Sequence, residues 1–184
     1  MKSKACSDAS SAESAAIPSC AGFPPVVEAG AEILILGSMP GVPSLQASEY
    51  YANPRNAFWW IAEQLWGVDA SASYSQRLAS LRQSKVALWD VLSYCQREGS
   101  LDSRIIASSE EAQPLAPFLA TYPSIQRVAF NGNKAHAAWK KHIATAWPAG
   151  QIKPTLIALP STSPAHAALS REQKLAEWRE RLLA

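Results

Sequence analysis

Short apolar runs alternate with amphipathic stretches along the chain from Gly22 onward. Each of these runs is bounded by polar or turn residues and is separated from the next by enough residues for a helix: Ile33–Leu36, Val86–Leu92, Arg127–Phe130 and Thr155–Leu159. Runs that are apolar throughout are typical of parallel strands covered on both faces. The pattern therefore predicts an α/β fold, a single three-layer domain with a four-stranded parallel central sheet flanked by helices.

Three segments between and after these strands have helix signals. Asn53 followed by Pro54 is typical of an N-cap with proline at the first helical position, and the apolar positions that follow continue that helix. Residues 133–143 predict a second helix with a basic outer side. Ser170 and Gln173 have the spacing of a capping box, which predicts that a third helix begins directly after Ser170.

The N-terminal segment differs in composition from the rest. Residues 1–22 contain six Ser and six Ala and almost no apolar side chain, which predicts a flexible tail without a catalytic part. We accordingly expect residues 23–184 to form the functional domain. The segment has no basic region followed by an apolar core, so we do not expect export.

Composition narrows the class of protein. The longest clean apolar stretch is far shorter than the roughly 20 residues that a membrane-spanning helix needs. The three cysteines have no paired spacing, which predicts neither a disulfide framework nor a four-cysteine metal or iron–sulfur site. We expect a reduced, soluble, cytoplasmic protein, associated with the nucleoid if it is bacterial.

The net charge of +2 hides an asymmetry along the chain. The span 112–171 holds six basic residues and no Asp or Glu, so the remainder has 11 basic and 15 acidic residues. Such a block is a plausible footprint for a polyanion. A solvated face without a partner accounts for the composition equally well.

Small and polar residues follow the predicted strands. They form four segments: Gly37–Gly41, Asp90, Asn131–Asn133 and Pro160–Pro164. Each alone is compatible with an ordinary strand-to-helix turn. In an open α/β sheet, however, ligands bind beyond the carboxyl ends of the strands, near the switch in strand order, so the four together indicate one shared site.

Several common chemistries lack their motifs. The first segment has neither the Gly-Lys-Ser/Thr ending of a phosphate-binding loop nor a dinucleotide fingerprint, and Ser38 is not in a Gly-x-Ser-x-Gly elbow. The histidines have no spacing with Cys or carboxylates that would predict zinc. We interpret His136 and His142 as helix-surface residues.

The first of these segments belongs to a longer stretch with a recognisable pattern. Residues 33–61 read ILILGSMPGVPSLQASEYYANPRNAFWWI and closely resemble the first motif region of the uracil-DNA glycosylase superfamily, in particular its hypoxanthine-DNA (DNA-deoxyinosine) glycosylase branch. Residues 87–105, 128–135 and 159–167 resemble that branch in order and spacing. The resemblance covers nearly everything except the predicted tail.

The resemblance implies a monofunctional enzyme that acts on double-stranded DNA. It would flip a deaminated base, hypoxanthine from deoxyinosine, out of the duplex and hydrolyse the N-glycosidic bond, leaving an abasic site. No cofactor, no metal and no membrane is implied, and we expect a monomer. The implied fold, a parallel four-stranded sheet between helices, agrees with the fold predicted from the apolar runs.

One position departs from the better-known branches of that superfamily. They have Asp or Asn third in the first motif, where it positions or activates water, and this chain has Met39. Met39 can neither accept a proton nor orient water. The resemblance implies Asn56 as the catalytic residue instead, because an amide can hold water against the anomeric carbon when bond breaking is largely dissociative. A polar residue in the first turn of a helix is the alternative role for Asn56.

Base-binding roles are also implied by position. The resemblance assigns them to Gly37, Ser38, Met39, Tyr51 and Asp90. Tyr51 would stack on the flipped base, with Tyr50 as a competing candidate and a core role as the alternative. Asp90, taken as an ionised carboxylate that only accepts hydrogen bonds, would read a ring N–H such as that of hypoxanthine. Asp90 could otherwise be a capping residue.

The remaining implied contacts are to DNA. The loop that begins at Pro160 resembles the motif that enters the minor groove, although Leu159 replaces the histidine that begins this motif in relatives. We expect His166 either to contact a phosphate or to be a surface residue. The predicted DNA-binding residues are Asn131, Asn133, Lys134, Ser161, Thr162, Ser163 and His166.

Two other functions stay open at this stage. The same chemistry could act on uracil or on a G·T or G·U mismatch, although Met39 argues against efficient uracil removal. A nucleic-acid-binding module that kept the fold and lost catalysis is the alternative from another class.

Overall fold

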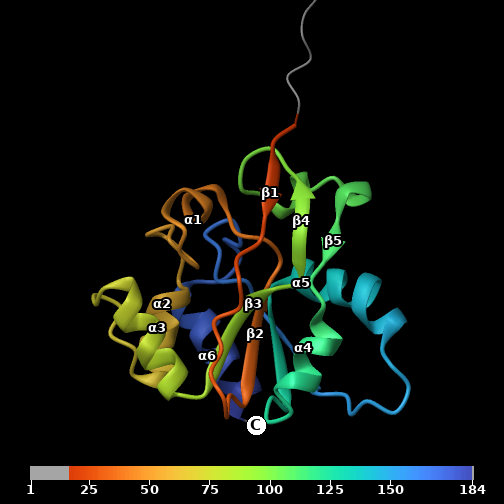
Figure 1. Cartoon of the computed structure of the whole chain (residues 1–184). Coiled ribbons are helices and arrows are strands. Elements are labelled where there is room, and N and C mark those ends of the chain that lie inside the picture. The colour runs from red at the N-terminus through yellow and green to blue at the C-terminus, as the bar shows by residue number, and fades with distance from the viewer. Residues whose placement is uncertain (1–16, 184) are drawn as a thin grey trace, which may run out of the picture.

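A four-stranded parallel sheet forms the centre of the computed structural model, which describes residues 17–183 (Figure 1). The strand order is β3-β2-β6-β7, with every neighbouring pair parallel. The strands are β2 (Ile33–Gly37), β3 (Val86–Asp90), β6 (Arg127–Asn131) and β7 (Thr155–Leu159). The predicted α/β fold with this central sheet is confirmed.

The order of the strands creates a crevice at one end of the sheet. From β2 the chain crosses to β3 on one side and then to β6 on the other side of β2. The strand order therefore switches between β2 and β6, where open α/β sheets bind ligands beyond the carboxyl ends. In register, Gly37 lies opposite Asp90, and Asn131 lies opposite Leu159.

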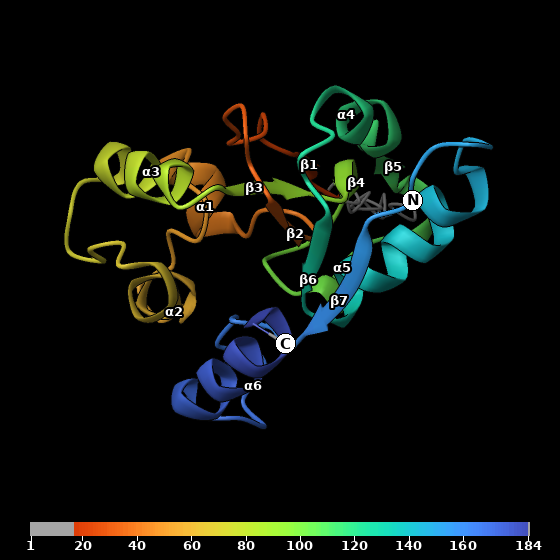
Figure 2. The ribbon, with the colours of Figure 1, turned by 90° about the horizontal axis from the view of Figure 1, so that it is seen from below.

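Helices cover both faces of this sheet (Figures 1 and 2). Side chains alternate along β2, so Ile33 and Ile35 pack in one buried cluster while Leu34 and Leu36 pack in the other. The first cluster includes residues of α2 (Phe58–Trp66), α3 (Tyr74–Gln83) and α6 (Arg171–Leu183). The second includes residues of α4 (Leu115–Thr121) and α5 (Asn133–Ala138).

A small antiparallel sheet lies beyond one end of the large one (Figure 1). Its strands, in the order β1-β4-β5, are β1 (Ser19–Ala21), β4 (Leu92–Gln96) and β5 (Glu111–Ala112). The single strand predicted over Val86–Leu92 is wrong, because the chain leaves β3 after Asp90 and pairs with new partners from Leu92 onward. The change of partner falls directly after Asp90, inside the run that the hydrophobic pattern treats as one strand.

The predicted tail over residues 1–22 is wrong for its last part. Ser19–Ala21 pair with β4, and Cys20, opposite Cys95, is buried. Backbone pairing orders this segment although its Ser/Ala composition lacks apolar character. Residues 1–16 lie outside the described residues.

The predicted helix starts have different outcomes. Asn53 does not cap a helix: its Oδ1 accepts from the backbone N of Arg55 at 2.9 Å within a turn, and α2 begins only at Phe58. The capping box at Ser170 is confirmed by two hydrogen bonds with Gln173, at 2.8 and 3.2 Å. The helix predicted over residues 133–143 is confirmed, with α5 continuing as a π-helix.

The shorter helical elements complete the description. They are α1 (Val42–Ala47), the 3₁₀ helices η1 (Asp102–Arg104), η2 (Ala107–Ser109) and η4 (Ala144–Ala146), and the π-helix η3 (Trp139–Ile143). Among residues 17–183, no helix is both long and apolar enough to cross a membrane.

Candidate functional site

A cavity of about 460 Å³ opens beyond the carboxyl ends of the parallel strands. Its volume is in the range of roughly 300–1,000 Å³ that is typical of ligand sites. Residues from all four segments expected at the strand ends line it, together with residues of the α1–α2 connection and of the loop that contains η1. The structure brings together every site residue predicted from the sequence: Gly37, Ser38, Met39, Tyr51, Asn56, Asp90, Asn131, Asn133, Lys134, Ser161, Thr162, Ser163 and His166.

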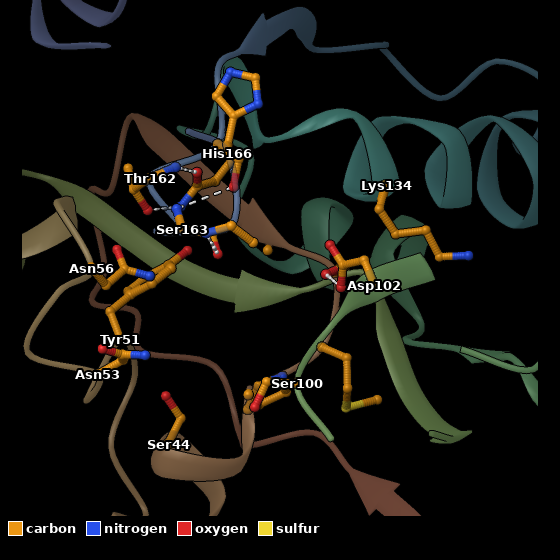
Figure 3. Close-up of a pocket in the computed structure, with 18 of the residues that line it drawn as sticks. Ser44, Tyr51, Asn53, Asn56, Ser100, Asp102, Lys134, Thr162, Ser163 and His166 are labelled. Carbon is orange, nitrogen blue, oxygen red and sulfur yellow. Dashed lines mark hydrogen bonds between the residues drawn. The ribbon is translucent and has the colours of Figure 1, made fainter. Parts of the chain in front are cut away.

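The lining has three sides (Figure 3). Tyr51 and Asn56 stand on one side, and Asp102 stands on the opposite side. Thr162 and His166 come from the loop that forms the third, and the ring of His166 points away from the other labelled side chains.

The floor of the cavity depends on a glycine. A Cβ atom added to Gly37 would collide with Oδ1 of Asp90 and would lie 3.5 Å from Oη of Tyr51. Only a residue without a side chain lets these two groups converge at the end of β2. The carboxyl of Asp90 and the ring of Tyr51 therefore share one corner of the cavity.

Asp90 is a buried carboxyl with an incomplete set of partners. It is 4% exposed, and its Oδ2 has no hydrogen-bond partner among the described residues. Burial, and then the charge of Asp102, raises the pKa of Asp90 to about 8 against the opposing effect of Arg97. The raised pKa favours the protonated form of Asp90, which donates as well as accepts, over the ionised acceptor expected from the sequence.

Asp102 is a site residue that sequence reasoning missed. It lies in η1, and its Oδ1 accepts a hydrogen bond of 2.7 Å from Oγ of Ser38. Burial raises the pKa of Asp102, while Ser38, Arg97 and Lys134 act in the opposite direction. No spacing in the sequence marks Asp102, because it reaches the cavity through a contact with the distant residue Ser38.

Tyr51 has the geometry of a stacking platform. Its ring stacks on Phe58, with centroids 3.9 Å apart and planes 18° apart, so Phe58 supports one ring face, and Tyr51 also lines the cavity. Its backbone has a φ of 56°, which is unusual for an aromatic residue and is found where the surrounding structure imposes it. Tyr50 also lines the cavity, but its hydroxyl donates to the carbonyl of Pro24 and its ring packs against Phe23.

Asn56 is held by the start of α2. Its Oδ1 accepts from the backbone N of Phe58 at 3.0 Å, which fixes the orientation of the amide. A carbonyl oxygen has a second lone pair, and Nδ2 makes no hydrogen bond within residues 17–183, so the amide keeps capacity for a ligand or water.

The loop over residues 160–164 is fastened to the end of β6. Nδ2 of Asn131 donates to Oγ1 of Thr162 at 2.9 Å, and the backbone N of Thr162 donates to Oδ1 of Asn131 at 2.8 Å. Gly132 allows the close approach, because a Cβ there would lie 2.9 Å from Cβ of Ser161. The amide of Asn131 thus positions the loop through one N–H and one lone pair, and the residue also lines the cavity.

Helix α6 supports the same loop from beneath. Nε1 of Trp178 donates to the carbonyl of Pro160 at 2.9 Å, and Nζ of Lys174 donates to the carbonyl of Ser163 at 3.0 Å. Lys174 is only 4% exposed, and burial lowers its pKa. Sequence reasoning missed Lys174, which the capping box of α6 places on the apolar side of the helix.

The basic block is not gathered at the cavity as composition suggested. Lys134 lines the cavity, whereas Arg127 and Lys153 lie at the amino ends of β6 and β7, the opposite end of the sheet. Lys134 and Lys141 are paired with the buried carboxylate of Glu110. The number of basic residues in the span 112–171 is therefore larger than the number of positive charges that line the cavity.

The two histidines of the α5 segment have partners within the protein. The ring of His136 stacks on Phe130, with centroids 4.8 Å apart, and Nε2 of His142 lies 2.8 Å from Oε2 of Glu110. Within residues 17–183, no group of three His, Cys, Asp or Glu side chains could hold a metal ion.

Comparisons with known proteins agree on one family. A family model of the uracil DNA glycosylase superfamily matches residues 24–184. A hypoxanthine DNA glycosylase of Methanosarcina acetivorans is 33% identical over 165 residues, covering 85% of this chain and 94% of that protein. A hypoxanthine DNA glycosylase of Methanosarcina barkeri is 40% identical over 115 residues, covering 62% and 72%.

A solved structure extends the likeness to the fold. The solution NMR structure of a Methanosarcina acetivorans protein assigned to the uracil DNA glycosylases superposes with a TM-score of 0.72 at 30% identity. The match covers 89% of this chain and 98% of that one.

Proposed function

Because the chain belongs to the uracil DNA glycosylase superfamily, we propose that it is a DNA glycosylase that removes hypoxanthine from deoxyinosine in double-stranded DNA. It hydrolyses the N-glycosidic bond and leaves an abasic site. The observation that carries this proposal is the cavity at the switch in strand order, lined by every residue that the superfamily motifs pointed to.

The base would enter the cavity beside Tyr51. The ring of Tyr51, supported on one face by Phe58, would offer a stacking surface in the cavity, and stacking contributes roughly 1–3 kcal/mol per base. Asp90 and Ser38 stand next to it as hydrogen-bonding groups for the base edge. A mismatched inosine costs less to unstack than a paired base, which supplies part of the selectivity.

Water would be held by Asn56. The N–H of Phe58 fixes the amide, and the second lone pair of Oδ1 accepts a hydrogen from the attacking water. The better-known branches of the superfamily have a carboxylate or an amide where this chain has the buried Met39, which has no polar group. Asn56 would therefore position the water, and no side chain would act as a strong base toward it. This arrangement favours a dissociative reaction in which the C1′–N9 bond is largely broken before water attacks.

The loop over residues 160–166 would hold the DNA strand. Ser161 and Ser163 line the cavity, and the loop that carries them is braced by Asn131 and α6. Because the loop is already held in place, its hydroxyl and backbone N–H donors can bind phosphates with little loss of conformational entropy on binding.

One experiment separates this proposal from its alternatives. The full chain is incubated with end-labelled duplexes that contain inosine, uracil or a G·T mismatch, and abasic sites are then cleaved with alkali. Cleavage of the inosine strand well above the other two supports the proposal. Faster cleavage of uracil or of the G·T mismatch moves the substrate to those bases, and retention of duplex without any abasic site contradicts an enzyme.

A further inference from the structure

Two carboxyl groups line the cavity, Asp90 buried and Asp102 on an exposed residue, and the reaction described above assigns neither of them a proton. Asp90 stands at the floor with Oδ2 buried and without a partner among the described residues. Asp102 lines the opposite side and accepts a hydrogen bond from Ser38. Like-charged neighbours in a site of low polarity do not both ionise, so their environments decide which one keeps the proton.

Asp102 holds a charge more readily than Asp90. Burial of its carboxyl raises the pKa of Asp102, but the hydroxyl of Ser38, which donates to it, and the charges of Arg97 and Lys134 oppose that rise. A hydroxyl donor stabilises the ionised form of a carboxyl, since the neutral form needs fewer donors. Asp102 is therefore the carboxyl whose charge the protein supports.

The surroundings of Asp90 favour the neutral form. The groups that face it are Asp102 from η1, Arg97 from the end of β4, and the hydroxyls of Tyr50 and Tyr51 from the α1–α2 connection. Of these only Arg97 favours ionisation; its Nη2 and Nε donate to the carbonyls of Pro40 and Gly99 at 2.5 and 2.9 Å, and its Nη1 is buried without a partner among the described residues. Burial and the charge of Asp102 together raise the pKa of Asp90 to about 8.

We propose that Asp90 is the acid that donates a proton to the departing base, and that Asp102 is the positioning residue whose negative charge keeps Asp90 protonated. This inference rests on the proposed function. Asp90 lines the cavity and shares a corner of it with Tyr51, so its carboxyl group lies beside the place where a base stacked on that ring would sit.

The step balances without a cofactor. The C1′–N9 bond breaks with its electron pair going to the purine, and the Asp90 proton passes to a basic atom of that purine. Water held by Asn56 forms the new C1′–O bond and releases one proton, which returns through solvent to the carboxylate of Asp90. The net reaction adds hydrogen to the base and hydroxide to the sugar.

An acid for the leaving base is consistent with the absence of a strong base for water among the proposed catalytic residues. Neither Met39 nor Asn56 can remove a proton from water, so little acceleration comes from the nucleophile. Negative charge grows on the purine as the bond breaks, and a donor aimed at it binds the transition state more strongly than the ground state. In this proposal the titratable carboxyl of Asp90 therefore assists the departure of the base, whereas no titratable group activates the water.

The test is the pH dependence of a single turnover. Rates of abasic-site formation in an inosine duplex are measured with excess enzyme, from about two pH units below to about two above the pKa of Asp90, for the wild type, Asp90→Asn and Asp102→Asn. Asp69→Asn, which removes an exposed carboxylate from the α2–α3 connection, is the matched control.

We expect the wild-type rate to fall about tenfold per pH unit above about pH 8 as Asp90 loses its proton. Asp90→Asn should lower the rate at neutral pH by about 100-fold and remove this alkaline limb, with duplex retention unchanged. Asp102→Asn keeps an acceptor for Ser38 and should move the limb by about one pH unit or more toward acid, because the charge that raised the pKa is gone. Asp69→Asn should match the wild type.

The outcomes separate the inference from the proposed function. Inosine excision without an alkaline limb, or a limb that Asp102→Asn leaves in place, would overturn the acid role while the glycosylase activity stands. An Asp90→Asn rate equal to that of the wild type would do the same. No excision by the wild type at any pH would instead refute the proposed function itself.

Discussion

Replacing Asp90 with Asn should make the protein more stable, relative to the wild type, as the pH rises. The pKa of Asp90 is raised from 3.8 to about 8 by its burial and by Asp102, so between these values the folded state holds a proton that the unfolded state releases. Wild-type stability therefore falls with rising pH by about 1.4 kcal/mol per unit, and above about pH 8 the loss is complete. The amide in the Asp90→Asn variant has no proton to lose and escapes this cost.

The magnitude follows from the width of the pH window. Between about pH 5 and about pH 8, three units at about 1.4 kcal/mol each give about 4 kcal/mol. We expect the free energy of unfolding of Asp90→Asn, minus that of the wild type, to grow by this amount across the window. Comparing the difference at two pH values cancels the constant effect of the amide on packing.

Urea denaturation followed by tryptophan fluorescence measures both proteins at each pH. Asp69→Asn is again the matched control, because its exposed carboxylate should show no such growth. A difference that stays constant within about 1 kcal/mol across the window would refute the reasoning, since Asp90 would then titrate as an ordinary carboxyl.

Three further substitutions test other parts of the site. Asn131→Ala removes both bonds to Thr162 and strands a buried N–H, so we expect a loss of about 2–4 kcal/mol in urea denaturation together with slower excision; an unchanged midpoint would show that the loop is held by α6 alone. Gly37→Ala should displace the carboxyl of Asp90 and lower the excision rate by about tenfold or more while duplex retention persists; a wild-type rate would mean that the floor has room for a methyl group. Glu110→Gln should free positive charge beside the site and steepen the dependence of log affinity on log salt by about one, and an unchanged slope in duplex retention would place these cations away from DNA.

The sequence predicted the central sheet because its signal is local. Strands such as β2 and β3, buried along their whole length, must be largely apolar, and the residues at the strand ends are small or polar because they build a site there. The same logic located Asp90 and the loop from Pro160 to Pro164, whereas Tyr51 and Asn56 were implied by the resemblance to the superfamily. Residues at the carboxyl ends of the strands could thus be predicted from the order of the strands along the chain.

What the sequence did not reveal depends on contacts between distant segments. The boundary between β3 and β4 is a change of pairing partner inside one apolar run, and β1 is ordered by β4 rather than by its own composition. Asp102 reaches the cavity because Ser38, 64 residues away, donates to it. The pKa of Asp90 depends on its burial and on the nearby Asp102, and no pattern of residues in the sequence predicts either.

The most direct test of the account compares the wild type with Asn56→Ala on one inosine duplex. We expect the wild type to generate abasic sites in a single turnover, and Asn56→Ala to do so slower by about 100-fold or more, with the duplex still retained in a mobility-shift assay. Thermal melting of both proteins confirms that α2 still forms without the Asn56 acceptor. Rapid excision by Asn56→Ala would contradict the assignment of the water-holding residue, and a wild type that retains the duplex but never releases hypoxanthine would contradict the account as a whole.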